Sequence, residues 1–246
     1  MDAVQEAIRA RSGVAAPWDA SYTRSAVARS PAPPLAAPIA IDAVVLRAGL
    51  GRVRRTIDRH AVALTRLDAV LGDGDHGDNL AIGFRAVEEV VAGLPPETLP
   101  GELLRAVGHR LVAAVGGASG PLYGTAFIEA GFRAGSATMI DGPLAAAMLD
   151  AATDGLARRG RCAVGDKTIL DTLRPAAAAL TEAVSTGTAT SDAARAMIEA
   201  ARRGMLSTRP LIARRGIALR LGERSAGHLD PGAVSCFLIL RALAGR

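Results

Sequence analysis

From Ile41 onward, hydrophobic and polar residues alternate with a helical period. The stretch IDAVVLRAGLGRVRRTIDRHAVALTRLDAVL, residues 41–71, places apolar side chains three and four positions apart, which is typical of one long amphipathic helix. The same spacing predicts further helices at 79–93, 102–115, 122–134, 143–159, 168–186, 191–206 and 232–244. Breaks that contain glycine, proline or threonine separate these segments, and no convincing run of alternating strand residues occurs. The pattern therefore predicts an all-α fold.

The N-terminal stretch differs from the rest of the chain. The segment SPAPPLAAPIA, residues 30–40, has the composition of a stiff and extended linker rather than of a packed element. We therefore expect residues 1–38 to be an N-terminal extension with a flexible Pro/Ala-rich linker. Residues 39–246 are expected to form one helical domain.

Composition and charge narrow the class of protein. Half of the 246 residues are hydrophobic and only 3% are aromatic, which favours close-packed, alanine-rich helices. The net charge is +5 and all but one of the 29 basic residues are arginine, spread along the helical segments. Because no basic arm with interleaved aromatic residues occurs, nucleic acid is not an expected partner, whereas affinity for anions stays open.

The cysteines and the hydrophobic runs bear on the cellular compartment. Cys162 and Cys236 lie far apart and form no C-x-x-C motif, so we expect buried free thiols in a reducing compartment. The N-terminus has acidic residues at Asp2 and Glu6 and lacks the apolar core of a signal peptide. The run CFLIL, residues 236–240, is too short to cross a membrane. We therefore expect a cytoplasmic protein that has no membrane partner.

The densest polar chemistry lies in LGDGDHGDN, residues 71–79, just after Asp68. Asp73 and Asp75 are two positions apart in a glycine-flanked loop, so an extended backbone would point both side chains the same way. Three carboxylates that face one point repel each other unless a cation lies between them. Their hard oxygen atoms suit Mg²⁺ or Ca²⁺.

Neither an EF-hand nor a zinc site fits this loop. An EF-hand requires glycine at position six and glutamate at twelve, but counting from Asp73 these positions are Asp78 and Phe84. The four histidines lack the spacing of zinc ligands. An alternative stays open for part of this loop: some of its Asp and Asn residues could belong to a solvated turn and cap the next helix.

A second loop has the features of an anion site. The stretch GGASGPLYG, residues 116–124, places glycines before a predicted helix, with Pro121 at the helix start and a hydroxyl at Ser119. Free backbone N–H groups at such a helix start bind anions. Glycine-rich breaks are also common between helices, so a purely structural role stays open.

A third loop, GRCAVGDKT at residues 160–168, only approximates a P-loop. Asp166 interrupts the motif before Lys167, and the preceding segment is helical where a P-loop requires a strand. Lys167 is the only lysine of the chain, and either chance or an ion pair with Asp166 or Asp171 could account for it.

The fourth loop, GERSAGHLDPGA at residues 222–233, ends in a helix start. Asp230 is a natural N-cap and Pro231 a natural first helical residue. Since alternate connections of an antiparallel helical array lie at one end, the loops at 68–79, 116–124, 160–171 and 222–232 could converge.

Taken together, the four loops resemble a known family. The stretches LDAVLGDGDHGDN, GGASGPLYG, RGRCAVGDKTILDTLRPA and GERSAGHLDPGA resemble, in order, those of the nucleotide-binding L subunit or L domain of dihydroxyacetone kinases. The resemblance covers about residues 41–246. It implies a closed barrel of eight antiparallel helices, with ADP or ATP and two Mg²⁺ ions held by the loops at one end.

The resemblance also implies roles for individual residues. The metal ligands would be Asp68, Asp73 and Asp75, and no catalytic residue is assigned in this chain. The nucleotide contacts would be His76, Gly77, Asp78, Asn79, Ala118, Ser119, Gly160, Ile169, Asp230, Pro231 and Gly232. In this family a separate K subunit holds the sugar, so the chain would transfer a phosphoryl group to dihydroxyacetone, or to a related short ketose, on a partner.

One position departs from the family. Where the family commonly has GRASYLG, with an arginine that contacts the nucleotide phosphates, this chain has GIALRLG at 216–222, so Ile217 replaces the arginine. Arg215 or Arg220 could substitute for it. The departure supports an alternative, a nucleotide-binding regulatory module that acts through a partner. Two versions of the kinase also stay open: ATP that reacts and leaves, or bound ADP recharged by a phosphotransferase-system protein.

Overall fold

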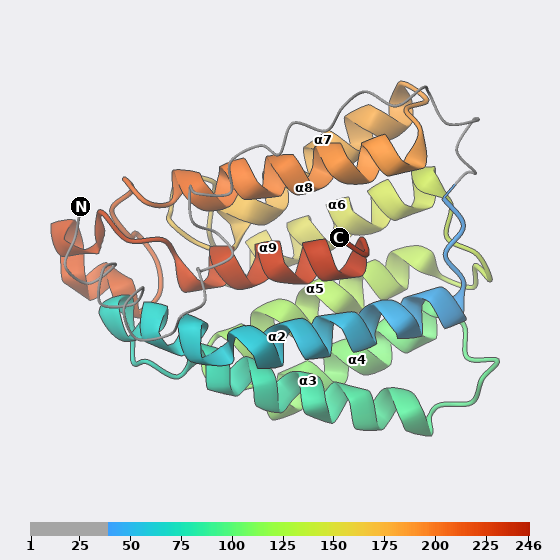
Figure 1. The fold of residues 1–246 in the computed structure, drawn as a ribbon, viewed down its shortest axis with the longest axis horizontal. Helices are drawn as coiled ribbons and strands as arrows, with labels where there is room; N and C mark the ends of the chain where they lie inside the picture. The colour runs from blue at the N-terminus through green and yellow to red at the C-terminus, as the bar shows by residue number, and fades with distance from the viewer. Residues whose placement is uncertain (1–38) are drawn as a thin grey trace. The chain divides into compact units, whose positions relative to one another are not determined.

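Eight α-helices make up most of the protein in the computed structural model, which describes residues 39–246 (Figure 1). They are α2 (Ala43–Leu71), α3 (His76–Gly93), α4 (Pro100–Ala114), α5 (Ser119–Ala134), α6 (Gly142–Gly160), α7 (Leu170–Ser185), α8 (Thr190–Ser207) and α9 (Pro231–Leu243). A 3₁₀ helix, η1 (Ile217–Ser225), lies between α8 and α9. Within this range the only strand-type pairing is an isolated bridge between Ile41 and Ile140, so the predicted all-α fold is confirmed. The predicted extension, residues 1–38, lies outside the described residues.

The helices form a closed circuit of neighbours. Each α-helix packs against the next one along the chain, and α9 returns to pack against α2. Ten of the thirteen residues of α9 are buried, because this helix also contacts α7 and α8. A helix that is apolar on all sides is expected to lie inside a fold. None of the described helices is both long and apolar enough to cross a lipid bilayer.

Aspartate caps define where three of the helices begin. The side chains of Asp42, Asp141 and Asp230 each accept a hydrogen bond from a backbone N–H in the first turn of α2, α6 and α9. Such caps satisfy N–H groups that have no partner within the helix. The cap at Asp230 was predicted from the sequence and is confirmed.

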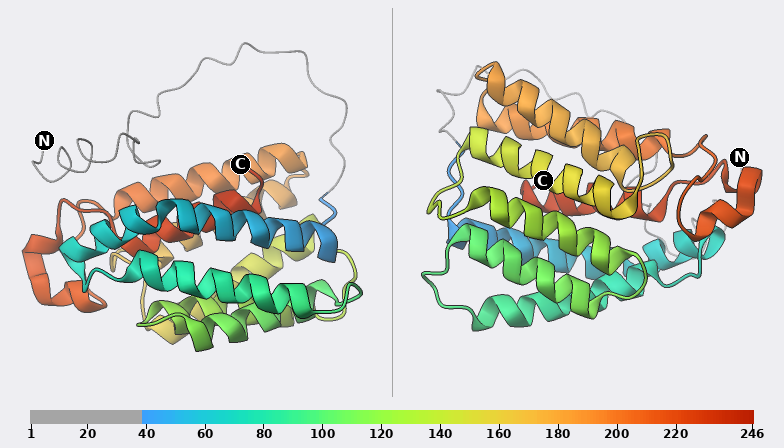
Figure 2. Two further views of the ribbon diagram at one scale, coloured as in Figure 1. Left: turned by 60° about the horizontal axis from the view of Figure 1, so that its bottom comes forward. Right: turned by 180° about the vertical axis from the view of Figure 1, so that it is seen from behind.

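The four connections that carry the polar motifs lie at one end of the helices. They are the segments between α2 and α3, α4 and α5, α6 and α7, and α8 and α9. At the left of Figure 1, α2 ends and α3 begins beside η1, and the reverse view in Figure 2 shows the same grouping at the right. The predicted convergence of these loops is therefore present.

Several boundaries differ from the predicted ones. Helix α3 begins at His76 rather than at residue 79, and α5 begins at Ser119 rather than at residue 122. Residues 76–78 and 119–121 therefore lie in the first turns of these helices, not in loops. The η1 helix was not predicted; its kink at Gly222 has a φ of 55°, so local periodicity did not reveal it. Both cysteines are free as expected, but Cys162 is only half-buried.

Helices α4 and α5 are in direct backbone contact at glycines. A Cβ added to Gly108 would lie 2.6 Å from the carbonyl oxygen of Gly124, and one added to Gly124 would lie 2.7 Å from that of Gly108. Farther along the same contact, a Cβ on Gly131 would lie 2.7 Å from the carbonyl oxygen of Gly101. Since these neighbours are backbone atoms, the helices can accommodate a side chain only by moving apart.

We predict that Gly124→Ala destabilises the protein by about 1–3 kcal/mol, because it overpacks this helix contact. Gly93→Ala is the matched control: no atom lies within 4 Å of the added methyl, so its effect should be small. Urea unfolding followed by circular dichroism at the helix band gives both free energies. Equal unfolding midpoints for the two variants would contradict the close approach of α4 and α5.

Candidate functional site

A cavity of about 520 Å³ lies among the four converging connections. This volume is typical of a site for a small organic ligand. Eleven of the fourteen site residues expected from the sequence line it: Asp68, Asp73, Asp75, His76, Ala118, Ser119, Gly160, Ile169, Asp230, Pro231 and Gly232. Residues from distant parts of the sequence thus share one pocket, because the helices between them run from end to end of the fold.

The other three expected residues do not line the cavity. Gly77 is buried against α2, where an added Cβ would lie 2.0 Å from the carbonyl oxygen of Ala61. Asp78 is exposed on the first turn of α3. The side chain of Asn79 hydrogen-bonds to Asp75. The structure gives Gly77 a packing role and Asn79 a supporting one, and direct ligand contacts of these three residues stay predictions.

The buried carboxylate of Asp68 shapes the loop that follows α2. Its Oδ2 accepts hydrogen bonds from the backbone N–H groups of Gly74, Asp75 and His76, at 3.0, 3.1 and 3.2 Å. The loop is not extended as expected: Gly74 has a φ of 76°, and Asp75 has a ψ of −4°. Asp73 and Asp75 face Asp68 because the backbone wraps around its side chain.

Asp68, Asp73 and Asp75 form a compact carboxylate cluster. Each offers an oxygen atom, and these atoms all lie within 4.8 Å of one another. Burial, together with the negative charges of Asp73 and Asp68, raises the pKa of Asp75. Asp75 precedes α3 but makes no side-chain cap bond, so capping does not account for its carboxylate. A set of three hard oxygen ligands suits a divalent cation such as Mg²⁺.

His76 links three helices beneath the pocket. Its Nδ1 lies 3.0 Å from Ser119 Oγ, its Nε2 lies 2.8 Å from Ser235 Oγ, and Ser235 Oγ lies 2.6 Å from the hydroxyl of Tyr123. Burial lowers the pKa of His76 to about 4, so the ring is neutral near pH 7. Neither Ser235 nor Tyr123 was predicted: Ser235 lies in an apolar helix without a motif, and Tyr123 belongs to the stretch 116–124, where only the glycines, Pro121 and Ser119 were given a role.

Lys167 joins two of the connections. It is buried with a φ of 63°, and its Nζ donates to the carbonyl oxygens of Thr208 and His228. The ion pair with Asp166 or Asp171 that the sequence left open is not formed among the described residues. Burial lowers the pKa of Lys167, while nearby carboxylates oppose that change. The ammonium group thus fastens the α8–α9 connection to the α6–α7 connection.

The cavity wall shows which of the two arginines named as substitutes for Ile217, Arg215 or Arg220, lies at the pocket. Ile217 lines the cavity, as expected for that position. Arg215 also lines it, together with Arg159, whereas Arg220 is exposed and is not part of the lining. Of these two arginines, Arg215 is therefore the one that lines the cavity.

Asp230 lies at the pocket wall, where α9 begins. Its Oδ2 accepts the N–H of Ala233 at 2.7 Å, and its own N–H donates to Thr208 Oγ1 at 3.1 Å. Burial raises the pKa of Asp230 to about 7, although the cap bond and the charge of Lys167 both lower it. The carboxyl group therefore changes charge close to neutral pH.

We predict that this titration couples to folding. Because the pKa of Asp230 is higher in the folded state than the ordinary value of 3.8, the folded state binds more protons between about pH 4 and 7. This contribution to stability is complete below that window and is lost as the pH rises through it. Asn at this position keeps a capping oxygen, so Asp230→Asn should unfold with a weaker dependence on pH. Urea unfolding at pH 5, 6, 7 and 8 measures the difference, and parallel curves would contradict the shift.

Comparisons with known proteins find relatives over most of the chain. The DAK2 domain family matches residues 70–245. The chain is 38% identical over 190 residues to the "PEP-dependent dihydroxyacetone kinase 2, ADP-binding subunit DhaL" of Listeria innocua. This alignment covers 76% of this chain and 87% of that protein. It is also 38% identical over 185 residues to the "PEP-dependent dihydroxyacetone kinase, ADP-binding subunit DhaL" of Escherichia coli. That alignment covers 74% of this chain and 86% of the Escherichia coli protein.

A solved structure shares the fold. The dihydroxyacetone kinase of C. freundii, in complex with AMP-PNP and Mg²⁺, superposes with a TM-score of 0.61 and 25% sequence identity. The match covers 91% of this chain but only 37% of that kinase, so the likeness concerns one part of the larger protein. With the DAK2 match over most of the sequence and the similarity to DhaL subunits, the chain belongs to the DAK2 domain family of dihydroxyacetone kinases.

Proposed function

We propose that this chain is the nucleotide-binding subunit of a kinase for dihydroxyacetone or a related short ketose. It binds ADP or ATP with Mg²⁺ and passes a phosphoryl group to a sugar held on a separate K-type subunit. The observation that carries this proposal is the cluster of three carboxylates at the cavity of about 520 Å³. The names of its relatives, which include ADP-binding subunits of dihydroxyacetone kinases, support it.

The carboxylate cluster fits Mg²⁺. Oδ2 of Asp68 is occupied by three backbone N–H groups, so its Oδ1 is the oxygen left to face a metal ion. A Cβ on Gly72 would lie only 2.4 Å from this Oδ1, so a larger residue there would displace the carboxylate. Asp73 and Asp75 are exposed and complete the set. Mg²⁺ bound there would neutralise charge on the phosphates, and the sequence resemblance predicts two such ions.

Helix starts provide the groups that would receive phosphate oxygens. Gly116, Gly117 and Ala118 line the cavity directly before the first turn of α5, where backbone N–H groups lack helical partners. Ser119 adds a hydroxyl whose position is held by His76. Because His76 is neutral, it orients this hydroxyl without adding charge to the site. The start of α9, at Pro231 and Gly232, forms a second wall of the cavity.

Two apolar side chains of the cavity lining, Ile169 and Leu122, suit the base of the nucleotide. Gly160 lies beside Leu122 in this lining. A Cβ on Gly160 would lie 3.2 Å from the Leu122 side chain and 3.1 Å from Cys162 Sγ, so glycine keeps this wall open. We propose that Ile169 contacts the base, as the family resemblance predicts.

The second candidate function, a regulatory nucleotide-binding module, is favoured by Ile217, which places an apolar side chain in the cavity lining. Assays with a K-type subunit separate the two functions. A kinase subunit should support phosphorylation of dihydroxyacetone or erythrulose only when both proteins are present. Nucleotide binding without any phosphorylation of these ketoses would favour the regulatory module.

We predict that Asp73→Ala abolishes Mg²⁺-dependent nucleotide binding and turnover without unfolding the protein, because Asp73 is exposed and its loss removes a metal ligand. Calorimetric titration with ADP, with and without Mg²⁺, measures binding, and turnover is assayed with a K-type subunit. Glu97→Ala is the control, since Glu97 is exposed in the α3–α4 connection at the other end of the helices. Unchanged turnover in Asp73→Ala would eliminate the proposed metal site.

The two versions of the kinase predict different behaviour of bound ADP. If ATP binds, reacts and leaves as ADP, bound ADP should exchange rapidly against labelled nucleotide. If ADP stays as a cofactor that a phosphotransferase-system protein recharges, exchange should be slow compared with turnover. A filter-binding exchange experiment on the purified complex compares the two rates, and slow exchange would contradict the first version.

A further inference from the structure

The cavity combines strong negative charge with a smaller number of cations. Its lining contains four carboxylates and three basic side chains, which are Asp68, Asp73, Asp75, Asp230, Arg159, Lys167 and Arg215. A polyphosphate bound there needs positive charge on the side away from the metal. The Nζ of Lys167 already donates to the carbonyl oxygens of Thr208 and His228, so its hydrogen bonds are largely committed to the protein. Arg159 and Arg215 are therefore the basic side chains of the lining that can bind an anion.

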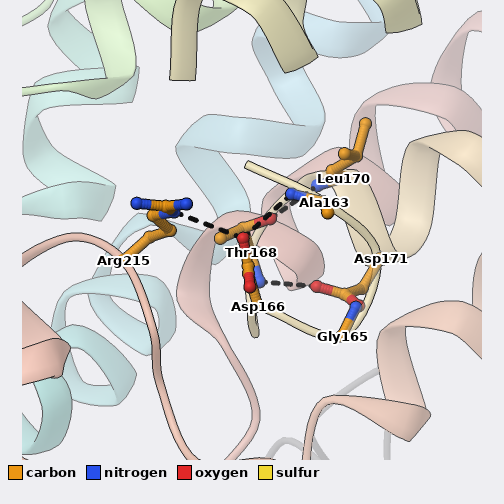
Figure 3. Close-up of polar contacts among 7 residues, drawn as sticks. All are labelled: Ala163, Gly165, Asp166, Thr168, Leu170, Asp171 and Arg215. Carbon is orange, nitrogen blue, oxygen red and sulfur yellow. Dashed lines mark hydrogen bonds and ion pairs between the residues drawn. The ribbon is translucent and has the colours of Figure 1, made fainter. Parts of the chain in front are cut away.

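Arg215 is fixed in place by Asp166. The Nε of Arg215 lies 3.2 Å from Asp166 Oδ2 (Figure 3). The backbone N–H of Arg214 donates to the carbonyl oxygen of Asp166 at 3.0 Å. The side chain of Asp166 is 11% exposed and that of Arg215 is 50% exposed. The mostly buried Asp166 thus binds the Nε of the Arg215 guanidinium. The two Nη groups are left for a planar, bidentate contact with an anion.

The loop that carries Asp166 is itself held by buried groups. Asp166 Oδ2 accepts the N–H of Ala163 at 2.9 Å, which closes a short turn. The buried carboxylate of Asp171, in the first turn of α7, accepts the N–H groups of Gly165 and Thr168 at 2.6 and 2.7 Å, as Figure 3 shows in part. Because the support is preformed, Arg215 loses little conformational freedom when it binds a ligand.

Neither of the other arginines is held in this way. Arg159 is exposed near the end of α6, and no ion pair fixes it among the described residues. Arg220 is exposed and is not part of the cavity lining. After Arg215, Gly216 has a φ of 66°, a turn that favours glycine, and Ile217 follows in the cavity wall. Positions 215 and 217 therefore face the same space, so a guanidinium from either one can reach it.

We propose that Arg215, positioned by Asp166, binds the phosphate oxygens of the nucleotide and makes the site prefer a nucleoside diphosphate or triphosphate over the unphosphorylated nucleoside. This assignment rests on the proposed function and deepens it. It gives Arg215 the contact that an apolar side chain at Ile217 does not make. It also gives Asp166 a positioning role, since Asp166 acts on the ligand only through Arg215.

The test compares single and double variants by calorimetric titration with Mg²⁺-ADP and with adenosine. Arg215→Ala should weaken binding of ADP about tenfold or more, because charge-assisted hydrogen bonds are lost, and should leave binding of adenosine unchanged. Arg220→Ala, which removes the same charge outside the cavity, is the matched control and should bind ADP like the wild type. Asp166→Asn should give a smaller loss for ADP alone.

A rescue experiment separates a direct contact from a structural effect. In the double variant Arg215→Ala with Ile217→Arg, a guanidinium again faces the cavity, and affinity for ADP should recover. Equal affinity of Arg215→Ala and Arg220→Ala for ADP would overturn the inference and leave the proposed function intact. So would an equal loss of affinity for ADP and adenosine. If the wild-type protein binds no Mg²⁺-ADP at all, the proposed function fails, and the inference fails with it.

Discussion

The buried carboxylate of Asp68 is the contact on which the pocket depends. It lies in the last turns of α2, yet one of its oxygen atoms receives three backbone N–H groups from the following loop and from the start of α3. A carboxylate with three such donors compensates for its loss of water. The same contacts turn the loop so that Asp73 and Asp75 face Asp68. One side chain therefore both folds the loop and completes the carboxylate cluster.

The α6–α7 and α8–α9 connections are built on the same principle, with polar groups held by the backbone. Asp171 binds two N–H groups of the α6–α7 connection, and Lys167 binds two carbonyl oxygens of the α8–α9 connection. Asp166 then fixes Arg215. Among the described residues, the buried charges of Asp68, Lys167 and Asp171 are thus satisfied by loop backbone, which ties the connections together although they are not regular elements.

The helices supply the frame for these loops. Where α4 and α5 meet, glycines bring the two backbones into contact, and Gly77 allows the same approach between α3 and α2. Such contacts fix the spacing of the helix ends, and hence the spacing of the loops that they carry. His76, Ser119, Ser235 and Tyr123 then tie α3, α5 and α9 together directly beneath the cavity. The packing of the helices and the geometry of the pocket therefore depend on the same contacts.

The sequence by itself determined the helical class, the order of the elements and the four polar loops, because helical periodicity and glycine or proline breaks are local properties. It also pointed to Asp68, Asp73 and Asp75 as one group, although for a wrong reason, since the loop is wrapped rather than extended. Only the tertiary structure decided the partners of Lys167, the hydrogen bonds that join His76 to Ser235 and Tyr123, and which of Arg215 and Arg220 lines the cavity. These depend on contacts between residues 41 to 159 positions apart, and no local pattern encodes such contacts.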